Sequence, residues 1–180
     1  MEKTIFLIGY MASGKTTLGR AFARAAGREF IDLDQYITRR FRKTIPEIFA
    51  EKGEEGFRQL ERNMLREAGA FNGVVVSCGG GTPCFYDNME FMNANGVTVW
   101  LKAGVECIVR RILCAKTRRP ITEGKTPEEL PAFVAAHLRQ REPYYSQAQL
   151  TLGSEDLETA SGISATVATL QQRLHILQTR

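Results

Sequence analysis

The glycine-rich segment at residues 9–16, which reads GYMASGKT, constrains the fold more than any other feature of the chain. It matches the pattern G-x-x-x-x-G-K-[ST], and it lies between an apolar run at residues 4–8 and a helical pattern at residues 17–26. Backbone N–H groups can converge on phosphates only where side chains leave room, and glycine provides that room. The segment therefore predicts a strand, a phosphate-binding loop and a helix in succession.

The residue types in this loop suit the phosphates of a nucleotide. Lys15 can reach the phosphate that is transferred, the hydroxyl of Thr16 can bind Mg²⁺, and the helix that begins near Gly14 adds the positive end of its dipole. We expect ATP to contact the loop at Ala12, Ser13, Gly14, Lys15, Thr16 and Thr17. The simpler alternative is a glycine turn that carries a surface lysine.

Phosphate-binding loops also occur in GTPases and motor ATPases, so the loop alone does not name a reaction. The chain lacks an NKxD motif for guanine and a DxxG switch motif, and no expected strand ends in the Asp-Glu pair of many ATP-hydrolysing machines. A small-molecule kinase fits these features best.

Short apolar runs alternate with helical patterns along the rest of the chain. Further strands are expected at residues 29–33, 74–77, 97–101 and 149–152. One helical stripe is formed by Phe57, Leu60, Met64, Leu65 and Ala68, and the last by Ile163, Val167, Leu170, Leu174 and Leu177. This alternation predicts an α/β fold in which a five-stranded parallel sheet has helices on both faces and binds ligands at the carboxyl ends of its strands.

No linker or repeat divides the chain, so residues 1–180 are expected to form a single domain. Residues 34–70 carry helical patterns over a longer stretch than the usual crossover between two strands, and we expect them to form a substrate-binding flap. Residues 115–126 are polar and basic and contain Pro120 and Gly124, which favours a lid.

The composition narrows the classes of function. The chain is 43% hydrophobic and 24% charged, which is typical of a soluble globular protein. No apolar run approaches the roughly 20 residues of a membrane span, and residues 1–8 lack the features of a signal peptide, so a cytoplasmic protein without a membrane partner is expected. The four cysteines show no CxxC spacing, which disfavours a zinc site. The formal charge of +4 suits small anionic ligands at least as well as nucleic acid.

Two carboxylates follow the second expected strand. Asp32 and Asp34 are two residues apart at its end, and alternation along a strand would aim both side chains the same way. One carboxylate can help to hold hydrated Mg²⁺, while the other engages the hydroxyl of the acceptor. An equally simple interpretation of Asp34 is that it caps a helix that starts at Gln35.

Two arginines and a run of glycines are candidates for binding an acidic acceptor. Arg58 lies beside its apolar helical stripe, with Glu61 one turn later to orient it. Arg141 shortly precedes Pro143, Tyr144 and Tyr145, where we expect its helix to end. Two converging guanidinium groups would select a carboxylate, and the glycines at residues 79–81 would let backbone amides approach it. Taken singly, each arginine could be a solvated surface residue and the glycines a plain turn.

Six motifs in one order and spacing make the pattern specific. They are GxxxxGKT at residues 9–16, F-I-D-L-D at 30–34, G-F-R-x-x-E at 56–61, GGG at 79–81, R-P at 119–120 and R-x-P-x-Y at 141–145. Over residues 5–152 the chain thereby resembles the shikimate kinases. The resemblance implies a three-layer P-loop kinase fold with strand order 2-3-1-4-5. It also implies phosphorylation of the shikimate 3-hydroxyl by ATP, giving ADP and shikimate 3-phosphate on the route to chorismate and the aromatic amino acids.

The resemblance also implies which residues bind shikimate. They are Asp34, Arg58, Gly79, Gly80, Gly81 and Arg141. The two arginines would hold the carboxylate, and Asp34 would contact the ring hydroxyls. The partners would then be ATP and shikimate, bound by a monomer that has no nucleic-acid partner.

Catalytic and metal-binding roles follow from the same resemblance. Lys15 and Arg119 would neutralise charge on the migrating phosphoryl group, the latter from the closing lid. Together with Asp34 they would form the catalytic set. Thr16 would ligate Mg²⁺, with Asp32 in the outer coordination sphere.

Two positions depart from the family pattern or leave it open. Many shikimate kinases have glycine where this chain has Ala12, and a methyl group there is tolerated if φ is negative but strained if φ is positive. The basic residue that stacks on adenine would be either Arg110 or Arg111, unless these residues form a solvated helix face.

Two other functions remain to be separated from this one. A small-molecule kinase such as a gluconate kinase shares the loop and the lid, but it would not by itself call for both Arg58 and Arg141. A nucleotide-binding regulatory module without turnover is the third, although the chain keeps Lys15, Asp34 and Arg119.

Overall fold

A five-stranded parallel sheet in the order β2-β3-β1-β4-β5 organises the structure, a computed structural model that describes residues 2–115 and 124–178. The strands are β1 (Thr4–Ile8), β2 (Phe30–Asp32), β3 (Val75–Ser77), β4 (Gly96–Lys102) and β5 (Leu150–Gly153). The helices are α1 (Lys15–Ala26), α2 (Leu33–Phe41), α3 (Ile45–Gly69), α4 (Asn88–Asn95), α5 (Val105–Cys114), α6 (Leu130–Tyr145) and α7 (Ala160–Gln178), with a 3₁₀ turn, η1, at Thr82–Cys84. The expected strand order and parallel sheet are confirmed.

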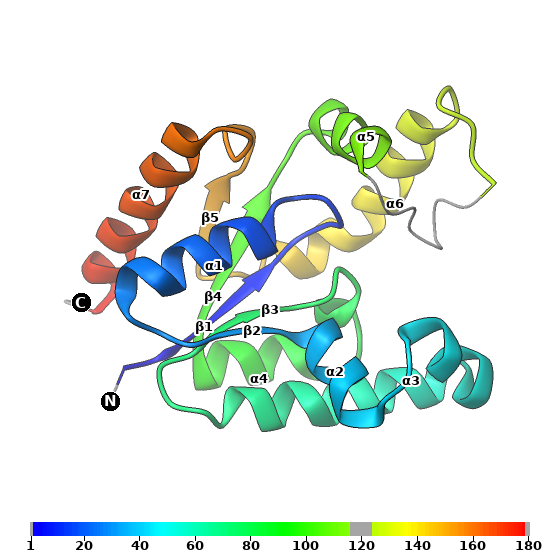
Figure 1. Cartoon of the computed structure of the whole chain (residues 1–180), viewed down its shortest axis with the longest axis horizontal. Helices are drawn as coiled ribbons and strands as arrows, with labels where there is room; N and C mark the ends of the chain where they lie inside the picture. Colours follow the sequence, from blue (N-terminus) through cyan, green and yellow to red (C-terminus); the bar gives the residue numbers. More distant parts are fainter. Residues whose placement is uncertain (1, 116–123, 179–180) are drawn as a thin grey trace.

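Strand β1 is apolar throughout because helices cover both faces of the sheet. Ile5 and Leu7 point to the face that α1 and α7 cover, where they pack in one core with Leu18 and Leu170. Phe6 and Ile8 belong to the second core, under α3 and α4 (Figure 1). Period-two alternation therefore divides a continuous apolar run between two layers.

The carboxyl ends of three strands meet at one edge of the sheet. Strand β1 runs in register with β3 on one side and β4 on the other, with Leu7 opposite both Ser77 and Val99. The phosphate loop follows β1, Asp32 ends β2, and the triple glycine follows β3. Because the strands are parallel, these three segments lie side by side.

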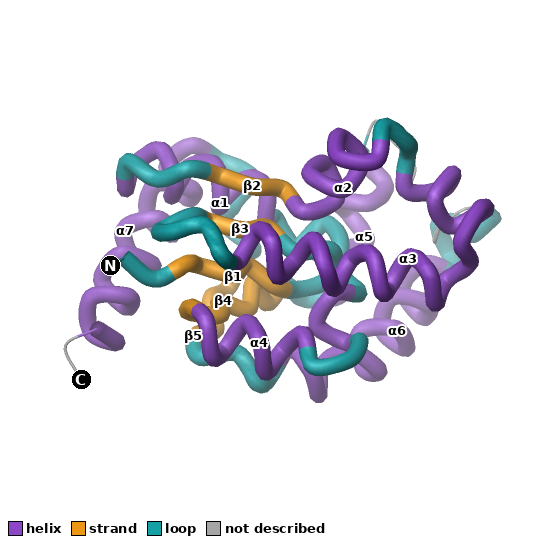
Figure 2. The backbone as a smooth tube through the Cα atoms, turned by 90° about the horizontal axis from the view of Figure 1, so that it is seen from below, coloured by secondary structure: helices purple, strands orange, loops and turns teal. Residues whose placement is uncertain are grey.

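Helices α2 and α3 extend from this edge beyond the sheet (Figure 2). Helix α3 begins with a capping box, in which the N–H of Glu47 bonds the hydroxyl of Thr44 and the carboxylate of Glu47 bonds the N–H of Thr44. The helix is interrupted at Gly53, whose φ of 67° and ψ of −178° only glycine adopts readily. The helical character expected of residues 34–70 is confirmed. The stretch forms α2 and α3, and α3 is kinked at Gly53.

One element boundary differs from expectation. Strand β2 ends at Asp32 and Leu33 already belongs to α2, so strand alternation does not extend to Asp34 and the prediction that both aspartates point the same way is wrong. Helix α6 ends at Tyr145, as expected for the segment from Pro143 to Tyr145. Proline removes one backbone hydrogen bond near the end of a helix, and α6 continues for two more residues before it stops. No helix in the described parts of the chain is long and apolar enough to cross a membrane.

Candidate active site

The phosphate loop connects β1 to α1 and holds Lys15 against its own backbone. The ammonium of Lys15 donates to the carbonyls of Gly9 and Tyr10, at 2.9 and 2.8 Å, and the residue is only 9% exposed. Gly9 has φ of 141°, and a Cβ atom there would lie 2.6 Å from the carbonyl oxygen of Leu101, so only glycine fits. The hydroxyl of Ser13 is buried and has no hydrogen-bond partner in the described structure.

Ala12 occupies the left-handed region of backbone conformation, with φ of 59°. From the sequence we expect strain at Ala12 only if φ there is positive, and φ is positive. A non-glycine residue in this conformation costs about 1–2 kcal/mol relative to a right-handed one. The chain therefore carries local strain at the centre of its phosphate loop.

Asp32 joins the end of β2 to both the phosphate loop and α2. One carboxylate oxygen accepts from the hydroxyl of Thr16 at 3.1 Å, and the other accepts from the backbone N–H of Gln35 at 3.2 Å. The helix cap is therefore Asp32, and the alternative that Asp34 caps the helix is wrong. A hydroxyl and a carboxylate side by side are hard oxygen donors of the kind that Mg²⁺ accepts, usually together with water and phosphate oxygens.

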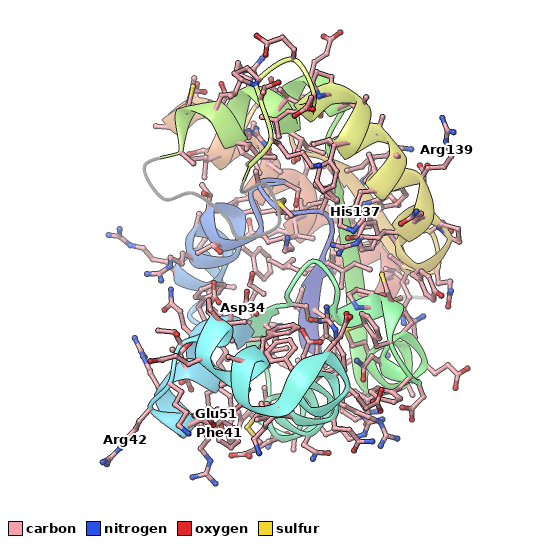
Figure 3. All side chains as sticks on the ribbon, turned by 90° about the vertical axis from the view of Figure 1, so that its right-hand side faces the viewer. Asp34, Phe41, Arg42, Glu51, His137 and Arg139 are labelled. Atoms are coloured by element: carbon pink, nitrogen blue, oxygen red, sulfur yellow. The ribbon has the colours of Figure 1, made fainter. Side chains whose placement is uncertain are left out.

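Asp34 lies in the first turn of α2 and turns toward the triple glycine instead of toward Thr16. A Cβ atom at Gly79 would lie 3.1 Å from a carboxylate oxygen of Asp34. The two aspartates thus serve different neighbours, and both line one cavity of about 750 Å³. Figure 3 shows Asp34 on α2 and His137 on α6 at this end of the molecule.

Arg58 is held in place on several sides. Its Nη1 donates to Glu61 at 2.8 Å, and its guanidinium lies 4.0 Å from the centre of the Phe85 ring. Glu61 is 1% exposed and also accepts from the hydroxyl of Thr82 at 2.6 Å. Burial raises the pKa of Glu61, although the adjacent Arg58 and the Thr82 hydrogen bond oppose this shift. The expectation that Glu61 orients Arg58 is confirmed. The Nε of Arg58 is buried and has no hydrogen-bond partner among the described atoms.

The triple glycine brings the two arginines together. A Cβ atom at Gly81 would lie 2.9 Å from Nη2 of Arg58, and one at Gly80 would lie 3.2 Å from Nη1 of Arg141. Side chains at these positions would push both guanidinium groups away. The hydroxyl of Tyr145 donates to the carbonyl of Gly80 at 2.6 Å and holds this segment against α6. The glycines follow β3 and are needed because neighbouring groups approach closely, not because of a left-handed conformation.

The cavity of about 750 Å³ runs from the phosphate loop to the triple glycine. Its lining includes Lys15, Thr16, Asp32, Asp34, Gly79, Gly80 and Arg111 but neither Arg58 nor Arg141, whose guanidinium groups lie close to Gly81 and Gly80. Arg111 donates to the carbonyls of Ala12 and Ser154. Arg110 does not line the cavity and pairs with Glu158 at 2.8 Å. Of the two arginines that the sequence left open, Arg111 is the one beside the phosphate loop.

One expected site residue lies outside the described residues. Arg119 falls in the undescribed segment 116–123, and so does most of the expected lid at residues 115–126. The described residues on either side of that segment, Ala115 and Gly124, both line the cavity.

Sequence reasoning missed the neighbours of Arg141. The hydroxyl of Tyr10 lies 3.0 Å from Nδ1 of His137, and the guanidinium of Arg141 lies 5.6 Å from the centre of the Tyr10 ring. His137 precedes Arg141 by one helical turn, which was an available signal. Nothing in the sequence indicates that Tyr10, which precedes His137 by 127 residues, packs beside that histidine.

This arrangement can hold a nucleotide's phosphates next to an acidic molecule that carries a hydroxyl. The family model for shikimate kinase matches residues 11–173. A shikimate kinase of Bacteroides thetaiotaomicron is 52% identical over 172 residues, which cover 96% of this chain and 98% of that protein. One of Parabacteroides distasonis is 51% identical, covering 89% of this chain and 93% of that protein.

Solved structures agree with the sequence relatives. The solved structure of shikimate kinase from Acinetobacter baumannii in complex with shikimate has a TM-score of 0.83 and 34% identity, covering 97% of this chain and 94% of that one. The structure of shikimate kinase from Bacteroides thetaiotaomicron has a TM-score of 0.93, covering 96% and 98%. With a matching family model over most of its length and relatives above 50% identity, this chain belongs to the shikimate kinase family.

Proposed function

We propose that this enzyme transfers the terminal phosphoryl group of ATP to the 3-hydroxyl of shikimate, giving ADP and shikimate 3-phosphate for the synthesis of chorismate. The observation that carries the proposal is the convergence of Arg58 and Arg141 on Gly81 and Gly80, beside the aspartate Asp34. Two guanidinium groups bind a carboxylate, and an aspartate binds hydroxyls, so the two arginines and Asp34 together select a hydroxylated acid.

The acceptor site is proposed to work by positioning. Arg58 and Arg141 hold the carboxylate while Gly79, Gly80 and Gly81 leave room for the ring. Asp34 binds the acceptor hydroxyl and orients it toward the phosphate loop. Most of the rate acceleration in phosphoryl transfer comes from such placement and from charge neutralisation.

The donor site is proposed to lie along residues 12–17, with Arg111 near the adenine. Lys15 leaves the carbonyls of Gly9 and Tyr10 to bind the transferred phosphate, and Arg119 adds positive charge from the lid at residues 115–126. A Mg²⁺ ion bound with ATP would supply further charge neutralisation. Thr16 would hold it, and Asp32, 3.1 Å from the Thr16 hydroxyl, would hold its water shell.

The proposal includes the organisation of the whole chain. Residues 1–180 form one kinase domain with a substrate-binding segment at residues 34–70, and the enzyme acts as a monomer in the cytoplasm, where ATP is available. Size-exclusion chromatography with light scattering tests this part separately.

A coupled assay of ADP release with Mg²⁺, ATP and shikimate tests the central claim. We expect saturable turnover that depends on shikimate and is absent with a neutral analogue in which the carboxylate is replaced. Arg58→Ala should raise the KM for shikimate by at least tenfold and the KM for ATP by less than threefold. Arg62→Ala, one turn further along α3 and paired with Asp87, is the matched control. Folded protein without shikimate-dependent turnover would refute the proposal.

A further inference from the structure

A hydrogen bond joins the phosphate loop to helix α6. The hydroxyl of Tyr10 lies 3.0 Å from Nδ1 of His137, and the two rings meet edge to face at an interplanar angle of 87°. Tyr10 is buried, with 1% of its surface exposed. His137 is further enclosed by the Phe133 ring, whose centre lies 5.5 Å away.

The main chain of Tyr10 belongs to the phosphate site. Its carbonyl accepts from the ammonium of Lys15 at 2.8 Å and from the N–H of Ser13 at 3.2 Å. The position of Tyr10 is therefore fixed at the backbone by the loop, and at the phenol by α6.

The ring of Tyr10 is also a contact surface for Arg141. The guanidinium of Arg141 lies 5.6 Å from the ring centre, within the range of a cation–π contact, and its Nη1 faces Gly80 on another side. His137 precedes Arg141 by four residues on the same helix, so both side chains lie on one face of α6. The hydroxyl bond to His137 thus holds in place the ring against which Arg141 rests.

We propose that Tyr10 and His137 are a positioning pair for Arg141 and thereby set the affinity of the enzyme for the carboxylate of its acceptor. This inference rests on the proposed function, in which Arg141 binds that carboxylate. Neither residue of the pair needs to touch the substrate. Loss of the hydrogen bond frees the Tyr10 ring to rotate, and Arg141 then loses the orientation that a bidentate contact requires.

The protonation of His137 is compatible with this role. Burial and the nearby charge of Arg141 both lower the pKa of His137, so the ring is neutral around pH 7.5. A neutral imidazole can accept the phenol proton at Nδ1 while Nε2 carries its own hydrogen.

Tyr10→Phe and His137→Leu remove the two halves of the bond while keeping apolar bulk. Each should raise the KM for shikimate about fivefold, with the KM for ATP and kcat changed by less than twofold. The double variant should be no worse than either single variant, because both remove one interaction. His137→Asn, whose amide can occupy the place of Nδ1, should recover part of the lost affinity. Tyr86→Phe removes a comparable phenol bond, to Glu55 at 2.6 Å, and serves as the control that leaves both KM values unchanged.

Isothermal titration of shikimate against each variant gives a second measurement, and circular dichroism confirms folding. An unchanged affinity for shikimate in folded Tyr10→Phe, equal rises of both KM values, or additive effects in the double variant would overturn the inference. If Tyr10→Phe does not fold, the comparison of His137→Leu with His137→Asn tests the same hydrogen bond. A wild-type enzyme without saturable shikimate turnover would instead overturn the proposed function.

Discussion

Glu61 accepts a hydrogen bond from Nη1 of Arg58 at 2.8 Å while its own carboxylate is almost wholly removed from solvent. Thr82 donates to the same carboxylate at 2.6 Å, so the anchor of Arg58 is tied to the segment that follows the triple glycine. A buried pair of this kind costs desolvation energy and stabilises a fold only weakly, but breaking it is expensive. Its main effect is to fix where the guanidinium lies.

Glu61→Gln should therefore impair both stability and acceptor binding. The amide keeps the shape of the side chain but leaves the charge of Arg58 without its buried counterion, so we expect a loss of about 2 kcal/mol in the free energy of unfolding. The KM for shikimate should rise several-fold more than that for ATP. Urea denaturation and steady-state kinetics measure the two effects. Glu51→Gln is the control, because the Glu51–Lys43 pair is exposed and Glu51 lies at the outer end of the flap (Figure 3). Equal losses of stability in both variants would contradict the argument.

Gly81→Ala tests whether the glycine is there to admit Arg58. The backbone at Gly81, with φ of −89° and ψ of −21°, accommodates alanine without strain. The added Cβ would lie 2.9 Å from a guanidinium that Glu61 and the Phe85 ring prevent from retreating. We expect the KM for shikimate to rise about tenfold or more with little change for ATP.

Gly104→Ala is the matched control for this substitution. A Cβ atom there meets nothing within 4 Å, and Gly104 lies at the start of α5, outside the proposed site. Kinetics indistinguishable between the two alanine variants would show that Gly81 does not control the position of Arg58.

The elements with strong periodicity could be predicted from sequence alone. Strand β1 lies at residues 4–8 as expected, because a phosphate loop demands a strand before it. The apolar stripe of α3, from Phe57 to Ala68, is buried as its spacing indicated. The contact of Glu61 with Arg58 also followed from sequence, since one turn of helix separates the two residues.

Boundaries and long-range contacts could not be predicted in the same way. An aspartate after an apolar run is compatible with a strand end and with a helix cap, and at Asp32 it serves as both. The left-handed backbone at Ala12 depends on how the loop folds between β1 and α1, which residue type alone does not reveal. The contact of Tyr10 with His137 requires the sheet order to be known first, because β1 and α6 are distant in sequence.

Ala12→Gly should stabilise the protein. Alanine at φ of 59° is strained by about 1–2 kcal/mol, and the greater freedom of glycine in the unfolded chain offsets part of the relief. We therefore expect the free energy of unfolding to rise by about 1 kcal/mol, measured by urea denaturation. Ala25→Gly, at an exposed position within α1, should lower it by a similar amount because glycine is unfavourable in a helix. Destabilisation by both substitutions would mean that the loop does not strain Ala12.

His137 should make the stability of the enzyme depend on pH in mildly acidic solution. Burial and Arg141 lower its pKa below the value of about 6.5 that it has in the unfolded chain. Between these two pKa values the unfolded state binds more protons than the folded state, so the free energy of unfolding rises with pH through this window. The contribution is fully present above about pH 6.5 and is lost as the pH falls. In His137→Gln the slope across the window should be smaller than in the wild type. Urea denaturation at a series of pH values from 5 to 8 measures these slopes, and an unchanged slope in His137→Gln would show that neither burial nor the charge of Arg141 lowers the pKa of the imidazole.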